Sequence, residues 1–329
     1  MRLIIYILFL TFPILIFGQD FRLKRDLDGH QASVTTVSLN LKNDLLYSGD
    51  SGGNIFIWDF KKGKIKKKLK GHEGKIRSIE FNTVGSKMVS SSDDGTIKVW
   101  DAFKYKLLYT FDYPELKTDP DNTKAIFAIY TPSNRDIYFG GNSKKLYKTK
   151  RDNKKVQVVH TSENRISSAI LSPNQEHLVF STGCTIKYLN LNSESVEKEV
   201  NLCEEGEFVI QNMRFSADGS QLIVLRDDGF IMFWDCEEGK EIEDLKVTYE
   251  KGGAVFDMSG NNKYMVTANY GNLARVWFNS NAKFLIRNLA GHTAKVGTVD
   301  MSDDAKYIIT GSDDKLIKVW EYYDVAKKR

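Results

Sequence analysis

The 329-residue chain carries 47 basic and 43 acidic side chains, a formal net charge of +4, and 41% of its residues are hydrophobic. This surplus is too small to indicate a nucleic-acid-binding protein without a local basic patch, and the apolar content excludes a disordered chain. The length fits one large all-β domain or two smaller domains.

Residues 1–18 differ in composition from the rest. Arg2 precedes an apolar run from Leu3 to Phe17, and Gly18 follows. This arrangement predicts a secretory signal peptide that is cleaved after Gly18. A membrane anchor is the alternative, but the run is shorter than the ~20 residues of a spanning helix and contains Pro13. The chain has no Asn-x-Ser/Thr sequon, which favours a bacterial protein that is periplasmic, envelope-associated or extracellular.

The mature chain is built from a repeated unit, best seen in residues 71–101. It opens with Gly71-His72, closes with Trp100-Asp101, and holds three short alternating runs separated by Gly, Asp and Ser. Such runs predict antiparallel strands joined by tight turns. The unit recurs every 40 to 49 residues, a period typical of repeat folds. Its third-strand positions are Trp58, Trp100, Thr149, Leu189, Trp234, Trp277 and Trp320.

The paired Gly-His and Trp-Asp dipeptides resemble those of WD-repeat β-propellers. They are clearest in the units that contain Gly29-His30, Gly71-His72 and Gly291-His292. The resemblance implies an all-β, seven-bladed propeller of four-stranded antiparallel blades over residues 19–329.

Closure of the ring is also predicted. The run FRLKRDLDGH, which begins at Phe21, resembles KIKKKLKGH, the outer strand that precedes Glu73. We therefore expect residues 21–28 to complete the last blade by pairing with the strand around Ile317, which would remove an open sheet edge.

The resemblance also implies structural tetrads, in which a His contacts a Ser or Thr and an Asp while the Trp accepts a hydrogen bond. One tetrad would use His72, Asp94 and Trp100 with Ser90 or Ser92. Another would use His292, Asp314 and Trp320 with Thr310 or Ser312. The first repeat has His30 and Trp58 but Gly52 where the Asp is expected, so its network is expected to be incomplete. A catalytic triad seldom recurs within one chain, so a structural role is favoured.

Other chemistry has little support in the sequence. His160 and His177 are separated in the sequence from each other and from any Cys, no metal-ligand spacing occurs, and no Gly-rich phosphate loop precedes a helix. We therefore expect no catalytic residue, no metal and no cofactor.

The three cysteines are Cys184, Cys203 and Cys236. Folding the hairpin about Ser193-Glu194 places Cys184 opposite Cys203, which an exported protein could oxidise to a disulfide. Three buried free thiols are the favoured interpretation, and the disulfide is the alternative.

Charged side chains gather on the segments expected to form outer strands. Basic groups occupy residues 61–70 and 144–155, and an acidic group occupies residues 237–244. Lysine on an exposed sheet edge prevents edge-to-edge aggregation, so we interpret the groups as edge protection. A polyanion-binding or membrane-surface site is the alternative.

The function predicted from these features is a non-catalytic platform that binds a protein or peptide outside the cytoplasm. The resemblance implies that partners dock on the narrower face, formed by the Gly-His loops and the turns before the third strands. The residues placed near that face are Gln31, Ser33, Glu73, Lys75, Asp93, Thr293, Lys295 and Asp313. We expect a monomer with no nucleic-acid partner and no membrane span after signal cleavage. An exported propeller hydrolase or lyase acting at the channel mouth is the alternative.

Overall fold

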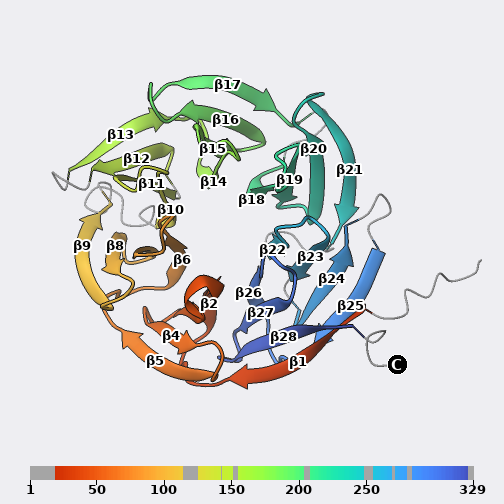
Figure 1. The fold of residues 1–329 in the computed structure, drawn as a ribbon. Coiled ribbons are helices and arrows are strands. Elements are labelled where there is room, and N and C mark those ends of the chain that lie inside the picture. Colours follow the sequence, from red (N-terminus) through yellow and green to blue (C-terminus); the bar gives the residue numbers. More distant parts are fainter. Residues whose placement is uncertain are drawn as a thin grey trace, which may run out of the picture.

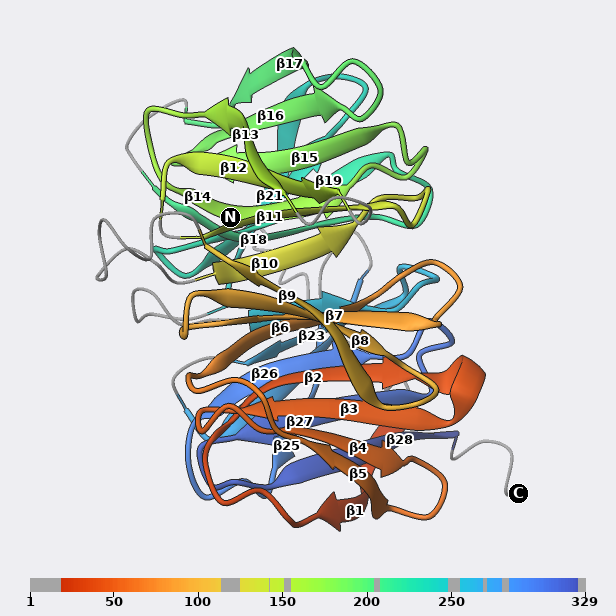
Figure 2. The same cartoon turned by 90° about the vertical axis from the view of Figure 1, so that its left-hand side faces the viewer.

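Radial four-stranded sheets form a ring around a central channel (Figure 1). This computed structural model describes residues 19–113, 125–141, 143–150, 155–203, 208–247, 255–268, 271–279 and 284–324. The signal peptide expected at residues 1–18 lies outside these ranges. Viewed from its edge, the ring shows the outer strands on its rim and the connecting loops on its two faces (Figure 2).

Seven antiparallel sheets are found in the described residues, and six of them are built from four consecutive strands. Blade 1 contains β2 (Val34–Asn40), β3 (Leu45–Asp50), β4 (Ile55–Asp59) and β5 (Lys64–Leu69), with the short 3-10 turn η1 (Leu41–Asn43) after β2. Blade 2 contains β6 (Ile76–Phe81), β7 (Lys87–Ser92), β8 (Thr96–Asp101) and β9 (Lys106–Asp112). Blade 3 contains β10 (Ala125–Tyr130), β11 (Asp136–Gly141), β12 (Lys145–Lys150) and β13 (Val156–Thr161).

The remaining blades follow the same order. Blade 4 contains β14 (Ile166–Leu171), β15 (His177–Thr182), β16 (Thr185–Asn190) and β17 (Val196–Asn201). Blade 5 contains β18 (Ile210–Phe215), β19 (Gln221–Arg226), β20 (Phe230–Asp235) and β21 (Lys240–Lys246). Blade 6 contains β22 (Val255–Met258), β23 (Tyr264–Ala268), β24 (Leu273–Phe278) and β25 (Phe284–Ala290). Blade 7 contains β26 (Val296–Met301), β27 (Tyr307–Ser312), β28 (Ile317–Asp324) and β1 (Gln19–Leu27).

The core lies between neighbouring blades, so the middle strands are covered on both faces. Every residue of β3 is buried, whereas four of the six residues of the outer strand β5 are exposed. Val89 of blade 2 packs with Ala128 and Phe139 of blade 3 in one such layer. Burial on both faces explains why the middle strands read as continuous apolar runs rather than as alternating ones.

The seven positions predicted from the repeat spacing are structurally equivalent. Trp58 pairs with Leu46, and Trp100 pairs with Met88 at the matching place in blade 2. Thr149 and Leu189 hold the same place opposite Ile137 and Leu178 in the blades that lack Trp. The predicted repeat alignment is therefore confirmed.

The N-terminal strand closes the ring, as predicted. In β1, Phe21 lies opposite Tyr322 of β28 and Leu27 lies opposite Ile317, with a bulge between Leu23 and Arg25. Figure 1 shows the two strands side by side at opposite ends of the colour scale. Phe21 and Leu27 are buried, so the closing strand contributes core side chains as well as backbone hydrogen bonds.

Candidate functional site

The loop before blade 1 is held by a complete tetrad. His30 Nδ1 lies 2.8 Å from Asp50 Oδ2, and His30 Nε2 lies 2.7 Å from Ser48 Oγ. Trp58 Nε1–H donates to the same Oγ at 2.8 Å. The prediction of an incomplete network was wrong, because Asp50 supplies the carboxylate two residues before Gly52.

Asp50 serves the turn as well as the histidine. Its Oδ1 accepts hydrogen bonds from the backbone N–H groups of Gly52 and Asn54, both at 2.9 Å. Burial raises the pKa of Asp50, but the hydrogen bonds from His30 and Asn54 outweigh burial and leave the pKa below its usual range. The carboxylate therefore stays charged and joins the loop before blade 1 to the turn after β3.

The predicted tetrads of blades 2 and 7 are both present. His72 contacts Asp94 at 2.8 Å and Ser90 at 2.7 Å. His292 contacts Asp314 and Thr310, each at 2.8 Å. The hydroxyl partners are thus Ser90 and Thr310. The alternatives Ser92 and Ser312 instead donate to the loop carbonyls of Gly74 and Ala294.

The tryptophans act as donors, so the expectation that they accept a hydrogen bond was wrong. Trp100 Nε1–H donates to Ser90 Oγ at 2.9 Å, and Trp320 Nε1–H donates to Thr310 Oγ1 at 3.0 Å. An indole nitrogen carries its proton and has no lone pair available to accept. Each hydroxyl is consequently enclosed between an indole and an imidazole, where no substrate can reach it.

The tetrad carboxylates also hold the loops of the candidate binding face. Asp94 Oδ2 accepts the backbone N–H of Glu73, and Asp314 Oδ2 accepts that of Thr293, both at 3.0 Å. The side chains of Glu73, Thr293 and Gln31 are exposed on these loops. Three of the predicted face residues are therefore presented to solvent from a fixed backbone.

A backbone bond joins each of these loops to the turn before its third strand. The N–H of Asp93 donates to the carbonyl of Lys75, and the N–H of Asp313 donates to that of Lys295, both at 2.9 Å. In blade 1, Ser33 accepts from Ser51 at the same distance. The structure thus places the predicted residues around the loop end of the channel.

Charged side chains of blades 2 and 7 lie close enough at this channel mouth to interact electrostatically. Burial lowers the pKa of the Lys75 ammonium, and the cation of Arg77 lowers it further. The cation of Lys295 in blade 7 also lowers the pKa of Lys75, whereas the carboxylate of Asp313 raises it. Arg77 donates two hydrogen bonds of 2.7 Å to Asp93. We call these five residues, Lys75, Arg77, Asp93, Lys295 and Asp313, the mouth cluster.

Deeper in the channel, the first strands of the blades carry one equivalent position each. The channel has a volume of about 860 Å³ and is lined by all seven first strands. Pairing with the second strands defines the equivalent residues, which are Ser38, Glu80, Ile129, Ile170, Arg214, Asp257 and Asp300.

Two of the three carboxylates at this level have structural partners. Asp257 forms an ion pair with Arg214 and accepts the backbone N–H of Met301 at 2.7 Å. Asp300 accepts that of Leu39 at 2.6 Å. Glu80 is exposed in the channel lining, with no hydrogen bond to its carboxylate among the described residues.

The proton affinity of this group is perturbed. Desolvation by the surrounding protein raises the pKa of Glu80 to about 7. The Asp300 carboxylate adds to this rise, and the Arg214 cation opposes it. Burial raises the pKa of Asp300 to about 6. The described residues contain no group of three or more His, Cys, Asp or Glu suited to a metal.

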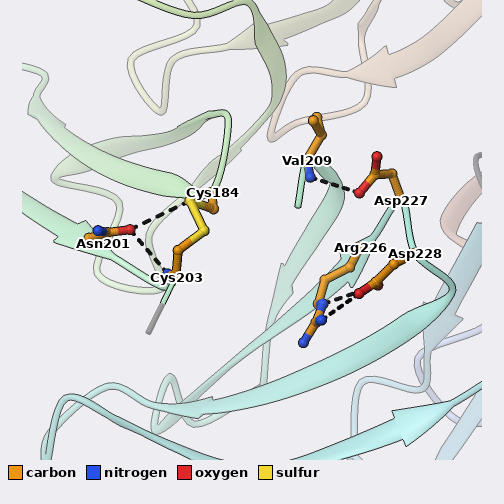
Figure 3. Close-up of a disulfide and its surroundings, with 7 residues drawn as sticks. All are labelled: Cys184, Asn201, Cys203, Val209, Arg226, Asp227 and Asp228. Carbon is orange, nitrogen blue, oxygen red and sulfur yellow. Dashed lines mark hydrogen bonds and ion pairs between the residues drawn. A yellow bond between two sulfur atoms is a disulfide. The ribbon is translucent and has the colours of Figure 1, made fainter. Parts of the chain in front are cut away.

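A disulfide that the sequence offered only as the alternative fastens the loop face at blades 4 and 5. Cys184 and Cys203 form a disulfide with 5.9 Å between their Cα atoms (Figure 3), so the favoured interpretation of three free thiols was wrong. Strand pairing places Thr185 opposite Asn201, one residue away from the expected register. The cysteines meet because both lie just beyond the ends of β16 and β17, and Cys236 remains free.

The turn after β19 completes this part of the face. Asp227 accepts the N–H of Val209 at 2.8 Å and donates its own N–H to the Val209 carbonyl at 2.9 Å. Asp228, which matches Asp94 in the sequence pattern, pairs with Arg226 instead of a histidine (Figure 3). The run RDDG at residues 226–229 resembles SDDG at residues 92–95, and this similarity could have predicted the turn.

The match to known families agrees with the strand arrangement. Residues 21–59, 63–101 and 283–321 match the family model described as WD domain, G-beta repeat. Each matched segment begins at an outer strand and ends at the third strand of the next blade. The blades in which the segments end are blades 1, 2 and 7, whose tetrads are described above. The chain is a WD-repeat β-propeller. WD-repeat propellers are typically non-catalytic scaffolds for protein interaction.

No curated protein matches the sequence at a significant level. Within the described part of this WD-repeat protein, there is no helix of the length and apolarity that crossing a membrane requires.

Proposed function

We propose that this WD-repeat protein is a non-catalytic interaction platform that acts outside the cytoplasm and binds a protein or peptide on its loop face. The mouth cluster is the observation that carries the proposal. Charged side chains from two blades converge there on backbone fixed by the tetrads of His72 and His292. A preorganised surface binds with a smaller entropy cost than a flexible one.

The charges of the mouth cluster support a partner that presents carboxylates. Arg77 already holds Asp93 in a two-bond ion pair. Lys75 is half-buried, and its pKa is lowered by burial and by neighbouring cations. A carboxylate brought beside Lys75 would relieve this repulsion between cations, because an opposite charge favours the charged form.

Export is part of the proposal and draws support from the disulfide. Cys184–Cys203 joins the turn before β16 to the second residue after β17. Disulfides form and persist in oxidising compartments and are rare in the cytosol. Together with the apolar leader at residues 3–17, this favours secretion. N-terminal sequencing of the protein from its native host should find Gln19 as the first residue.

The experiment that tests the face compares partners retained by three forms of the protein. Wild type, Lys75→Glu/Lys295→Glu and a control Lys198→Glu/Lys240→Glu would each be crosslinked in the native envelope fraction and purified. Lys198 and Lys240 are exposed on blades 4 and 5, away from the mouth. We expect one partner that the wild type and the control retain and the mouth variant loses. Retention of every partner by the mouth variant would reject this face.

The enzyme alternative receives no support from the channel. Asp257 and Asp300 are engaged by backbone N–H groups, and the tetrad hydroxyls are enclosed by Trp and His.

A further inference from the structure

The outer edge of blade 1 carries a concentration of cations that the proposed function does not use. Five exposed lysines lie on β5 or directly after it, and none has a carboxylate partner among the described residues. By contrast, Lys61 and Lys62, before the strand, pair with Asp44 and Asp59. We call the five, Lys64, Lys66, Lys67, Lys68 and Lys70, the lysine edge.

Protection against aggregation does not account for so many lysines. The outer strand β13 has the sequence VQVVHT and contains no Lys, Arg, Asp or Glu. The outer strand β25, FLIRNLA, contains one arginine. Both strands occupy the same place in their blades as β5 does in blade 1. Outer edges of this ring therefore do not require a row of lysines.

Exposed apolar side chains flank the lysine edge on the side of blade 2. Lys66 Nζ lies 5.7 Å from the ring centre of Tyr105, in the turn that leads to β9. Phe103 in the same turn is 61% exposed, and Leu107 and Leu108 at the start of β9 are 45% and 39% exposed. Cations and apolar groups thus adjoin one another on the rim.

The opposite flank has the same character. Arg25 of β1 donates to the carbonyl of Lys61 at 3.0 Å, which holds β1 against the turn before β5. Leu23 on that strand is 45% exposed. Figure 1 shows β1, β5 and β9 following one another around the outside of the ring.

We propose that the lysine edge and its apolar flanks bind the surface of an anionic lipid membrane. The ammonium groups would lie among lipid phosphates, while Phe103, Leu107 and Leu23 would enter the boundary between headgroups and acyl chains. Basic side chains near an anionic leaflet attract it, and apolar side chains beside them add buried area at the interface. The contact is peripheral and leaves the loop face and the channel free.

The shape of the surface favours a membrane over a linear polyanion. The strands β1, β5 and β9 form a convex rim in Figure 1, whereas proteins that bind single-stranded nucleic acid combine a positively charged groove with aromatic side chains that stack on the bases. The exposed leucines on both flanks would gain nothing from a phosphate chain.

Vesicle sedimentation tests the proposal. The whole mature protein would be mixed with vesicles of phosphatidylcholine alone or with 30% phosphatidylglycerol, at increasing salt. We expect binding only to the anionic vesicles and weaker binding as salt rises, because salt screens exposed charges. The variant Lys64→Gln/Lys66→Gln/Lys67→Gln/Lys70→Gln should lose affinity by about fivefold per lysine, on the order of several hundredfold in total.

A matched control removes the same charge elsewhere. Lys198→Gln/Lys240→Gln/Lys246→Gln/Lys263→Gln changes exposed lysines of blades 4, 5 and 6 and should bind anionic vesicles like wild type. Phe103→Ser/Leu107→Ser should weaken binding several-fold while keeping the salt dependence. Equal binding by the lysine-edge variant and wild type would overturn the proposal. So would binding of soluble polyphosphate by a protein that leaves anionic vesicles unbound, a result that would indicate a linear polyanion.

Discussion

The carboxylate of Asp300 in blade 7 accepts a hydrogen bond from the backbone N–H of Leu39 in blade 1, across 261 residues of sequence. Asp257 makes the same contact with Met301 from blade 6 to blade 7. First strands are sheet edges, whose N–H groups need partners from outside the sheet. Two aspartates therefore join the closing blades from inside the channel, while β1 joins them from outside.

Glu80 occupies the equivalent position but has no such contact, which leads to a prediction about pH. Its folded pKa of about 7 lies above the ordinary value, so the folded state disfavours the charged form. The penalty is absent below about pH 4.5 and grows as pH rises toward 7. Glu80→Gln should thus leave the melting temperature unchanged at pH 4.5 and raise it at pH 8, less than full burial would give because channel water reaches the side chain.

Glu321→Gln provides the opposite case. Burial raises the pKa of Glu321, but the hydrogen bonds from Lys24 and Tyr307 outweigh it and lower the pKa. Its stabilising contribution is present above the unfolded pKa and is lost as pH falls. The variant should lower the melting temperature slightly at pH 8. Equal shifts at pH 4.5 and pH 8 for Glu80→Gln would contradict the interpretation of the channel.

A second prediction concerns the tetrad of blade 1. Asp50→Ala would leave His30 and the N–H groups of Gly52 and Asn54 without their acceptor. Removing one member of such a buried network costs about 3 kcal/mol, which urea unfolding can measure. The control Asp28→Ala changes an exposed side chain and should cost less than about 0.5 kcal/mol.

Gly52 offers a way to restore that tetrad. Its backbone is not in the left-handed region, and a Cβ added there would lie 3.4 Å from Asp50 Oδ1. Adding Gly52→Asp to Asp50→Ala places a carboxylate at the sequence position used by blades 2 and 7, and should recover part of the lost stability. If Asp50→Ala alone were as stable as wild type, Asp50 would not hold the tetrad.

The ring was predictable from the sequence because each repeat carries its own turn-forming residues between its strands. Strands, turns and the third-strand positions follow from local patterns that recur, and β1 was recognised by its likeness to β5. The role of Asp50 in the tetrad was not predicted, because an alignment compares sequence positions, whereas a hydrogen bond depends on where the oxygen lies in space. An aspartate two residues early reaches the same imidazole when the turn bends toward it.

The channel carboxylates could not be grouped from the sequence, and the disulfide was only the less favoured interpretation, for a related reason. Glu80, Asp257 and Asp300 come from three repeats and meet only when the ring closes. For the cysteines, the strands pair Leu189 with Val196 next to the turn, a register that differs from a hairpin folded about Ser193-Glu194. Four residues of the mouth cluster, Lys75, Asp93, Lys295 and Asp313, were expected near one face because loops at equivalent repeat positions must gather there, whereas Arg77 was not.

A third prediction separates two roles of the closing strand. Phe21 is 1% exposed and packs against Tyr264 and Tyr322, so Phe21→Ala should cost about 3–5 kcal/mol. Leu23→Ala, at an exposed position on the same strand, should cost less than about 0.5 kcal/mol. Deletion of residues 21–27 removes the backbone pairing too and should lower the melting temperature most. A deletion that leaves it unchanged would contradict closure by β1.

The last prediction concerns the fastening of the loop before blade 5, where no Gly-His pair occurs. The disulfide closes a loop with a sequence separation of 19, and constraint of the unfolded chain by such a loop is worth about 3 kcal/mol. Cys184→Ala/Cys203→Ala should lose about that much stability, whereas Cys236→Ala, at a half-buried free thiol, should lose less. Hydrogen exchange should rise at Val209 and Ile210 in the double variant while His30 and its loop keep their protection, because the tetrad holds that loop.

Thiol labelling of the unfolded protein should find one reactive cysteine without reductant and three with it. Three in both conditions would show that the bond does not form in the native protein.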